Sequence, residues 1–370
     1  MDSLIVGAGI IGMMTAWELT QAGQSVAVID KKQIGQESSW AGGGILSPLY
    51  PWRYPQPVQR LAIWGQKMYP DLVASWYEAS GIDPQWLQSG LLILDTDELS
   101  KAQQWASLYG YKLAHLDAAQ IAELAPGINH QGEAIWLPEI GQVRNPRLVK
   151  AIRTSLLNAG VTFYEQTCVE EFLLDGERVI GVNAQQEGQS PAPIYADNTI
   201  VAGGAWTARL LKNLDMELPI EPVKGQMLMF NAKPGMLKQI VLNNDRYLIP
   251  RKDGRILVGS TLEKTGFDKS TSEAAHADLY YTAVDMLPAL ESVKVEKQWA
   301  GLRPSSPQGI PFIYRPDQYK GLYVNAGQYR NGVVLGPASA HFLVDIILER
   351  PPIADIESYQ PVAAGEMLAV

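Results

Sequence analysis

The chain contains very few residues that could bind a metal or form a covalent cross-link. Its only cysteine is Cys168, which cannot form an internal disulfide and excludes a zinc site built from cysteines. The four histidines are scattered over 370 residues without an HxxxH-type pair, so no metal site is expected. This cysteine usage fits a reducing compartment, and we expect a cytoplasmic protein.

Positive charge and long apolar runs are also scarce. Thirty lysines and arginines stand against 39 aspartates and glutamates, a formal net charge of −9 that argues against a nucleic-acid partner. No window of about 18 apolar residues occurs, and glycines interrupt the apolar stretch that begins at Leu4. The first three residues carry no positive charge, so we expect neither export nor stable membrane insertion.

The remaining composition is that of a folded globular protein. Hydrophobic residues make up 46% of the chain and charged residues 19%, which excludes a disordered chain. At about 150 residues per domain, the length favours two domains and permits one large one.

The first thirty residues predict a strand, a helix and a second strand. A short apolar run ends at Gly7, apolar residues recur at helical spacing from Ile10 to Leu19, and a second apolar run covers 26–29. Two strands joined by a helix within this length form a βαβ unit with parallel strands.

A glycine motif lies between the first strand and the helix. In GAGIIG, Gly7 permits a tight turn, Gly9 allows the backbone to approach a pyrophosphate, and Gly12 allows the helix to pack on the sheet. Asp30 ends the second strand, where a carboxylate can accept hydrogen bonds from ribose hydroxyls. The unit therefore predicts dinucleotide binding, and the later SSWAGGG stretch (38–44) suits a backbone pressed against a flat ligand.

Further along, the pattern continues to alternate between helices and strands. Asn145 is placed to cap a helix that starts at Pro146, and the RKDG turn at 251–254 predicts a hairpin between 247–249 and 256–258. Helices are also expected at 58–77 and 332–349, and strands at 90–94, 161–172, 179–183, 199–202 and 321–327. No repeat or low-complexity linker separates these elements, so the two domains are expected to be interleaved.

Several longer motifs carry a resemblance to a known family. They are GAGIIG, ESSWAGGG with SPLYPWRY, RNPRLVKA, PVKGQ, YLIPRKDGRILVGST, WAGLRP and AGQYRNG. Together they span residues 4 to about 350, and they resemble the glycine oxidases of the thiamine-biosynthesis type, within the D-amino-acid oxidase group of flavoproteins. The resemblance implies FAD, oxidation of an amine α to a carboxylate, dioxygen as electron acceptor, and a homo-oligomer.

The predicted fold is α/β (α+β overall), with a Rossmann-like FAD-binding domain interleaved with a mainly antiparallel-sheet substrate domain. We expect residues 1–85, 145–215 and 300–370 in the FAD-binding domain and residues 86–144 and 216–299 in the substrate-binding domain.

The resemblance also implies positions for cofactor and substrate. Besides Gly7, Gly9 and Gly12, the cofactor residues are Ile10, Ile11, Asp30, Lys31, Ser38, Ser39, Gly43, Gly44, Ile45, Val169, Gln328, Tyr329, Arg330, Asn331, Gly332, Val333 and Val334. The substrate residues are Tyr247, Arg303 and Arg330. Leu262 stands where a described member has Met, which leaves the shape of the substrate pocket and the substrate preference open.

The residue types at these positions suit an amino-acid substrate. A guanidinium can pair with both oxygens of a carboxylate, and Arg303 lies in the apolar WAGLRP segment, where the alternative is a structural ion pair with an acid. The hydroxyl of Tyr247 could share the carboxylate, although strand tyrosines are often only packed. No acid–base residue is expected, because hydride transfer to flavin needs a neutral amine and alignment.

Three functions remain open at this point. The favoured one is an oxidase acting on glycine, sarcosine, D-alanine or D-proline, which yields H2O2 and an imine that hydrolyses to the 2-oxo acid or feeds thiazole synthesis. The second is a D-amino-acid dehydrogenase that passes electrons to a quinone, and the third is a non-catalytic flavin-binding protein. Cys168 is expected on a strand, as a small residue of the hydrophobic core, well before the C-terminal segment that would contact the flavin. FAD is therefore expected to be non-covalent.

Overall fold

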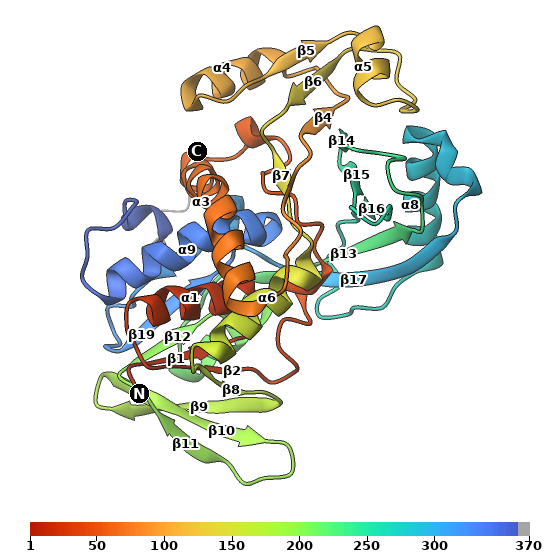
Figure 1. Cartoon of the computed structure of the whole chain (residues 1–370). Coiled ribbons are helices and arrows are strands. Elements are labelled where there is room, and N and C mark those ends of the chain that lie inside the picture. Colours follow the sequence, from red (N-terminus) through yellow and green to blue (C-terminus); the bar gives the residue numbers. More distant parts are fainter. Residues whose placement is uncertain (362–370) are drawn as a thin grey trace.

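The computed structural model describes residues 1–361 and contains two large sheets, between which the chain crosses several times (Figure 1). The first sheet has six strands, all parallel except for one edge strand that pairs antiparallel. In spatial order they are β18 (Phe312–Tyr314), β19 (Leu322–Ala326), β12 (Asn198–Val201), β1 (Ser3–Val6), β2 (Val26–Ile29) and β8 (Thr162–Tyr164).

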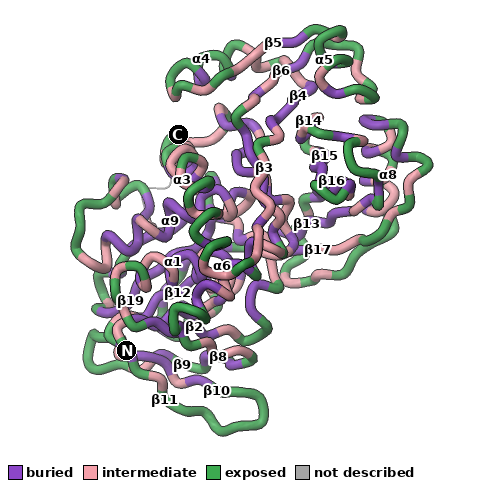
Figure 2. Tube along the Cα trace, viewed as in Figure 1, coloured by how far each residue is buried: buried purple, intermediate pink, exposed green. Residues whose placement is uncertain are grey.

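Both faces of the first sheet are covered, which explains the unbroken apolar runs of its strands. Ile5 and Val28 face a core formed with four helices, while Leu4 and Ile29 face a second core on the opposite side. Figure 2 shows these central strands as buried and the outer turns as exposed. The helices are α1 (Ile10–Gln21), α3 (Gln56–Ser80), α6 (Asn145–Asn158) and α9 (Gly332–Ile347). The opposite side is covered by β9 (Thr167–Asp175), β10 (Arg178–Gln186) and β11 (Ala192–Tyr195).

The second sheet has eight strands and is antiparallel except where β14 pairs with β4. Its order is β17 (Val295–Ser305), β13 (Glu221–Phe230), β16 (Ile256–Gly259), β15 (Arg246–Pro250), β14 (Ile240–Asn243), β4 (Leu91–Ile93), β6 (Ala134–Leu137) and β5 (Ala114–Leu116). One face packs on α8 (Glu273–Met286), and the other buries Met227, Tyr247 and Ile249.

The remaining elements are short, apart from α4. The helices are α2 (Ser38–Ala41), α4 (Leu99–Tyr109), α5 (Ala118–Leu124) and α7 (Thr207–Leu211), and the strands are β3 (Leu87–Gln88) and β7 (Gly141–Gln142). The 3-10 helices are Pro51–Arg53, Gly204–Trp206, Lys212–Leu214, Pro288–Ser292, Pro307–Gly309, Tyr329–Asn331 and Glu357–Tyr359.

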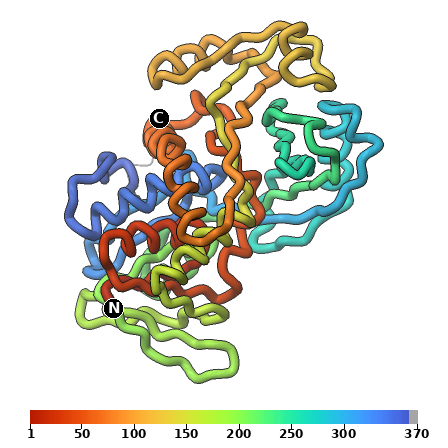
Figure 3. Tube along the Cα trace, viewed as in Figure 1, coloured from red at the N-terminus to blue at the C-terminus, as the bar shows by residue number. Residues whose placement is uncertain are grey.

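The predicted fold class is confirmed, because a mostly parallel βα half is interleaved with a mainly antiparallel sheet. Figure 3 shows segments from the start, the middle and the end of the chain running together in the first half, where β1, β12 and β19 are neighbours. The domain division stays a prediction. Its boundary at residue 300 falls inside β17, and residues 362–370 of the predicted FAD-binding domain lie outside the described residues.

Two local predictions are wrong. Asn145 is the first residue of α6 rather than its cap, and its buried amide Nδ2 instead donates a hydrogen bond to the carbonyl of Ser39 at 2.9 Å. Cys168 lies on β9 as expected, but it is exposed rather than in the core, because it points away from the buried face that Val169 occupies. In residues 1–361, no helix combines the length and the apolar character that crossing a membrane requires.

Candidate functional site

A cavity of about 440 Å³ lies where the parallel strands of the first sheet end and the second sheet begins. Ligands of open α/β sheets bind at this edge. The predicted residues that line it are Gly7, Gly9, Ile10, Ile11, Asp30, Lys31, Ser38, Ser39, Gly43, Gly44, Ile45, Val169, Tyr247, Arg303, Gln328, Tyr329, Arg330, Asn331, Gly332 and Val333.

Three predicted residues do not line this cavity. Gly12 is buried where α1 packs on β1, and a Cβ there would lie 2.0 Å from the carbonyl oxygen of Gly7. Val334 is fully buried in the core behind the cavity. Leu262 is 44% exposed and follows the two residues that approach Arg303, so its side chain lies outside the cavity wall.

The nucleotide end of the cavity is organised by Asp30. One carboxylate oxygen accepts the backbone N–H of Ala8 at 2.8 Å, and the other accepts that of Lys32 at 2.9 Å. Burial raises the pKa of Asp30 above its ordinary value, although these two donors act in the opposite direction. Beside it, the ammonium of Lys31 lies 4.1 Å from the ring centroid of Trp206, which also lines the cavity.

The glycine turn leaves space for a bound phosphate. Gly7 has a φ of +114°, and a Cβ there would meet the carbonyl oxygen of Ala202 at 2.4 Å. Gly9 differs, because a Cβ would have only the hydroxyl oxygen of Ser39 within 4 Å, at 3.3 Å. The turn therefore packs on protein at Gly7 and is open to the cavity at Gly9, in front of the N-terminus of α1.

Arg251, which the sequence analysis missed, holds the second glycine stretch. Its guanidinium donates to the carbonyl of Gly43 at 2.7 Å, to Oε1 of Gln142 at 2.7 Å and to the carbonyl of Val143 at 3.0 Å. Burial lowers the pKa of Arg251 to about 9, which leaves it charged at neutral pH. The only available signal was a basic residue at the hairpin turn, a position that is usually exposed.

The opposite end of the cavity is formed by the segment that enters α9. The backbone N–H groups at the start of this long helix supply partial positive charge beside Gly332 and Val333, which line the cavity. Nδ2 of Asn331 is buried and has no hydrogen-bond partner within residues 1–361. A buried amide without a partner is costly, so this donor requires an acceptor from a ligand or water.

Arg303, Arg330 and Tyr247 meet at this end. Arg303 comes from β17 and donates to Oγ of Ser260 at 2.5 Å and to the carbonyl of Thr261 at 3.2 Å. Burial lowers the pKa of Arg303, and the nearby charge of Arg330 lowers it further. In the described part of the chain, neither arginine forms a salt bridge with an acidic side chain.

Tyr247 reaches this region because its strand neighbour is glycine. It pairs with Gly259 across β15 and β16, and a Cβ on Gly259 would lie 2.8 Å from the Tyr247 hydroxyl oxygen. Among the described residues, no three His, Cys, Asp or Glu side chains come together so that they could hold a metal ion.

The residues of the cavity fit FAD. The cavity extends from Asp30 and Lys31 to Arg303 and Arg330, and it is open at Gly9. The buried amide Nδ2 of Asn331 has no acceptor among the described residues, and a bound cofactor can supply one. The family described as "FAD dependent oxidoreductase" matches residues 2–346, and the chain belongs to this family. FAD is therefore its cofactor.

Within that family the chain is an amino-acid oxidase similar to the glycine oxidases. It is 43% identical over 360 residues to the glycine oxidase of Pseudomonas aeruginosa, covering 97% of this chain and 98% of that protein. The glycine oxidase of Pseudomonas putida is 42% identical, with 97% of each chain covered. The crystal structure of glycine oxidase from Geobacillus kaustophilus superposes with a TM-score of 0.91 at 28% identity, covering 98% of both chains.

Proposed function

We propose that this enzyme oxidises glycine and other small amino acids, namely sarcosine, D-alanine and D-proline. The amino acid loses a hydride from Cα and a proton from nitrogen to give the imine, while O2 gains two electrons and two protons to give H2O2. When bound, FAD supplies N5 as the hydride acceptor and the route of the electrons to O2. The imine then hydrolyses to the 2-oxo acid or feeds thiazole synthesis for thiamine.

One observation carries the proposal: Arg303 and Arg330, which have no acidic partner among the described residues, line the same cavity as the dinucleotide motif. A small carboxylate is the ligand that such a pair of partly buried cations selects. We assign the carboxylate contacts to Arg303 and Arg330 and to the hydroxyl of Tyr247. These contacts leave the amine and Cα free to face the flavin.

The side chains around Arg303 and Arg330 suit the alignment of the substrate Cα with the flavin and, within the described residues, include no acid–base residue. Of all acidic and histidine side chains in residues 1–361, only Asp30 and Glu37 line the cavity, and both lie beside Lys32 at the nucleotide end. The substrate amine therefore loses its proton to water before hydride transfer, and the residues fix the approach of Cα.

Replacing Arg303 tests the assignment. Arg303→Leu keeps the apolar stem but removes the charge and both donors, so kcat/KM for glycine should fall at least about a hundredfold. FAD content should stay at the wild-type level, and amines that lack a carboxylate should lose much less. An equal relative loss for glycine and a simple amine would contradict the carboxylate role, and collapse of folding would indicate a structural one.

Anaerobic flavin bleaching tests the reaction itself. Purified holoenzyme is mixed with glycine, sarcosine, D-alanine or D-proline without oxygen, and the loss of flavin absorbance is followed. Air is then admitted, and we expect one H2O2 per amino acid oxidised. Bleaching that is reversed by a quinone and not by O2 would indicate the dehydrogenase, whereas no bleaching by any amino acid would indicate a non-catalytic flavoprotein.

We further propose that FAD is bound non-covalently. Cys168 lines the nucleotide end of the cavity, next to Val169 and within electrostatic reach of Lys31, which supports a position on the adenine side rather than beside the flavin. Acid precipitation should release the yellow cofactor into the supernatant, and flavin that stays with the pellet would contradict this. A cytoplasmic location and a homo-oligomeric state belong to the same proposal.

A further inference from the structure

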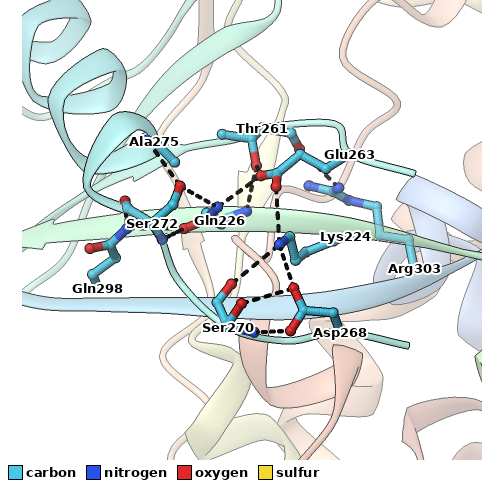
Figure 4. Close-up of polar contacts among 10 residues, drawn as sticks. All are labelled: Lys224, Gln226, Thr261, Glu263, Asp268, Ser270, Ser272, Ala275, Gln298 and Arg303. Atoms are coloured by element: carbon cyan, nitrogen blue, oxygen red, sulfur yellow. Dashed lines mark hydrogen bonds and ion pairs between the residues drawn. The ribbon is translucent and has the colours of Figure 1, made fainter. Parts of the chain in front are cut away.

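A lysine lies between two carboxylates beside the residues that hold Arg303, as Figure 4 shows. The side chain of Lys224, on β13, is 5% exposed, and its ammonium lies 3.1 Å from Glu263 Oε2 and 3.0 Å from Asp268 Oδ2. None of these three residues lines the cavity. The two carboxylate side chains are partly exposed, Glu263 at 28% and Asp268 at 48%, so these ion pairs contribute little to stability. Their best-supported use is to fix one arrangement of the chain.

The arrangement fixed here is the segment that follows β16. Thr261 and Glu263 continue along β13 through backbone hydrogen bonds, in which Lys224 N–H donates to Glu263 at 2.9 Å and Glu263 N–H donates to Lys224 at 3.0 Å. The hydroxyl of Thr261 accepts the backbone N–H of Gln226 at 2.9 Å and donates to Glu263 Oε1 at 2.5 Å. One oxygen of Glu263 is thus held by Lys224 and the other holds Thr261.

The same segment holds the guanidinium of Arg303. The two oxygens that accept from Arg303 are the carbonyl of Thr261 and the hydroxyl of Ser260, and Figure 4 shows Arg303 reaching toward Thr261. Arg303 lies on β17 and reaches Thr261 across β13, which lies between them. The guanidinium lies directly over Gly225, where a Cβ would come within 2.2 Å of both terminal nitrogens. The position of Arg303 therefore depends on strand β13 beneath it and on Ser260 and Thr261 beside it.

We propose that Thr261 and Glu263, with Glu263 held by Lys224, are positioning residues that fix the acceptors of Arg303. Two of the guanidinium N–H groups are occupied by these acceptors, and the remaining ones are directed to the substrate carboxylate. The inference rests on the proposed function, in which Arg303 binds that carboxylate. It adds that the carboxylate affinity is set by a group of residues outside the cavity.

Acetate binding to the oxidised holoenzyme tests the inference without turnover. Acetate carries only the carboxylate, and its dissociation constant is read from the change in the visible flavin spectrum. Thr261→Val removes the hydroxyl but keeps the size and the backbone carbonyl, and Glu263→Gln removes the charge that Lys224 requires. Each should raise the dissociation constant of acetate roughly tenfold, the effect of one lost hydrogen bond.

Two matched controls should behave like the wild type. Thr261→Ser keeps the hydroxyl. Glu296 lies on the same strand as Arg303 but pairs with Arg255, and Glu296→Gln weakens this surface ion pair without touching Arg303. Because the hydroxyl of Thr261 and the carboxylate of Glu263 share a hydrogen bond, the losses should not add, and the double variant should bind acetate about as weakly as Thr261→Val alone. In turnover, KM for glycine should rise while kcat changes by less than about threefold.

The outcomes separate the inference from the function on which it rests. If Arg303→Leu weakens acetate binding but Thr261→Val and Glu263→Gln do not, the positioning role is overturned and the role of Arg303 stands. If Arg303→Leu leaves acetate binding unchanged, both fail. Lower thermal stability of Thr261→Val and Glu263→Gln with unchanged acetate affinity would show a purely structural network and would also overturn the inference.

Discussion

At the scale of single residues, the substrate arginine depends on a neighbour without a side chain. Arg303 crosses strand β13 at Gly225, and a Cβ there would lie 2.2 Å from its terminal nitrogens. The backbone of Gly225 has no positive φ that would strain alanine. Gly225→Ala should therefore fold and bind FAD while displacing only the guanidinium, with kcat/KM for glycine falling between about tenfold and a hundredfold.

A glycine outside the site provides the control for this measurement. In Gly132→Ala the new Cβ would approach only the ring of His130, at 3.0 Å, so steady-state kinetics should match those of the wild type. Wild-type kinetics for Gly225→Ala would show that the guanidinium does not need its present position.

At the scale of elements, two glycines of the turn between β1 and α1 have different roles, one in folding and one in cofactor binding. Gly12 is where α1 packs on β1, and Gly9 faces the cavity. Gly9→Val should leave the melting temperature of the apoprotein close to the wild type but abolish FAD loading, because the side chain occupies the pyrophosphate space. Gly12→Ala should lower the melting temperature, since its Cβ would overlap the carbonyl oxygen of Gly7. FAD binding by Gly9→Val with unchanged affinity, measured by flavin fluorescence, would refute the phosphate site.

The contact between α1 and α9 is expected to depend on pH. Nδ1 of His341 lies 3.0 Å from Glu18 Oε2, Nε2 lies 3.7 Å from Asp345 Oδ2, and the hydrogen bond with Glu18 is the main cause that raises the pKa of His341. A raised pKa in the folded state means that this pair stabilises the fold below about pH 6.5. The contribution is lost as the pH rises through the pKa of His341 in the folded state. The charge of the nearby Arg350 lowers this pKa and so acts against Glu18.

Urea unfolding of wild type and of His341→Gln measures this contribution. The difference between the two free energies of unfolding should be larger at about pH 5 than at about pH 8. It should be modest at both, because the imidazole is one-third exposed and solvent screens the pair. An equal difference at the two pH values would show that His341 is only packed against Trp64, whose ring centroid lies 5.0 Å away.

At the scale of the whole molecule, Arg251 connects the second sheet to the glycine stretch that lines the cofactor cavity. It extends from the hairpin of the second sheet to the carbonyl of Gly43 beside the cavity. Arg251→Met should leave three acceptors without their donor, each costing about 1–3 kcal/mol when buried. We expect a lower melting temperature and an FAD dissociation constant raised more than about tenfold.

The neighbouring residue offers a control for both readouts. Lys252 is about half exposed and has only a distant contact of 3.9 Å with Asp83, so Lys252→Met should change neither. A loss of stability in Arg251→Met without a change in FAD affinity would show that Arg251 holds the neighbouring loops but does not shape the cofactor site.

The sequence alone determined the local features of this protein. It predicted the βαβ unit with its glycine turn, the hairpin at 247–258 and the helix that begins at Gly332. These features depend on apolar periodicity, turn residues and glycines, which are all signals between residues close in the sequence. The longer motifs also carried the family resemblance, and with it FAD and the class of reaction.

Only the tertiary structure decided which distant residues meet. Arg251 and Gly43 are 208 residues apart, and Thr261 and Arg303 are 42 apart, so nothing in their local patterns indicated contact. The exposure of Leu262 and Cys168 and the burial of Lys224 likewise depend on how the strands pack and which face each residue takes. The physical reason is that secondary structure depends on residues close in sequence, whereas a binding site depends on the docking of whole sheets.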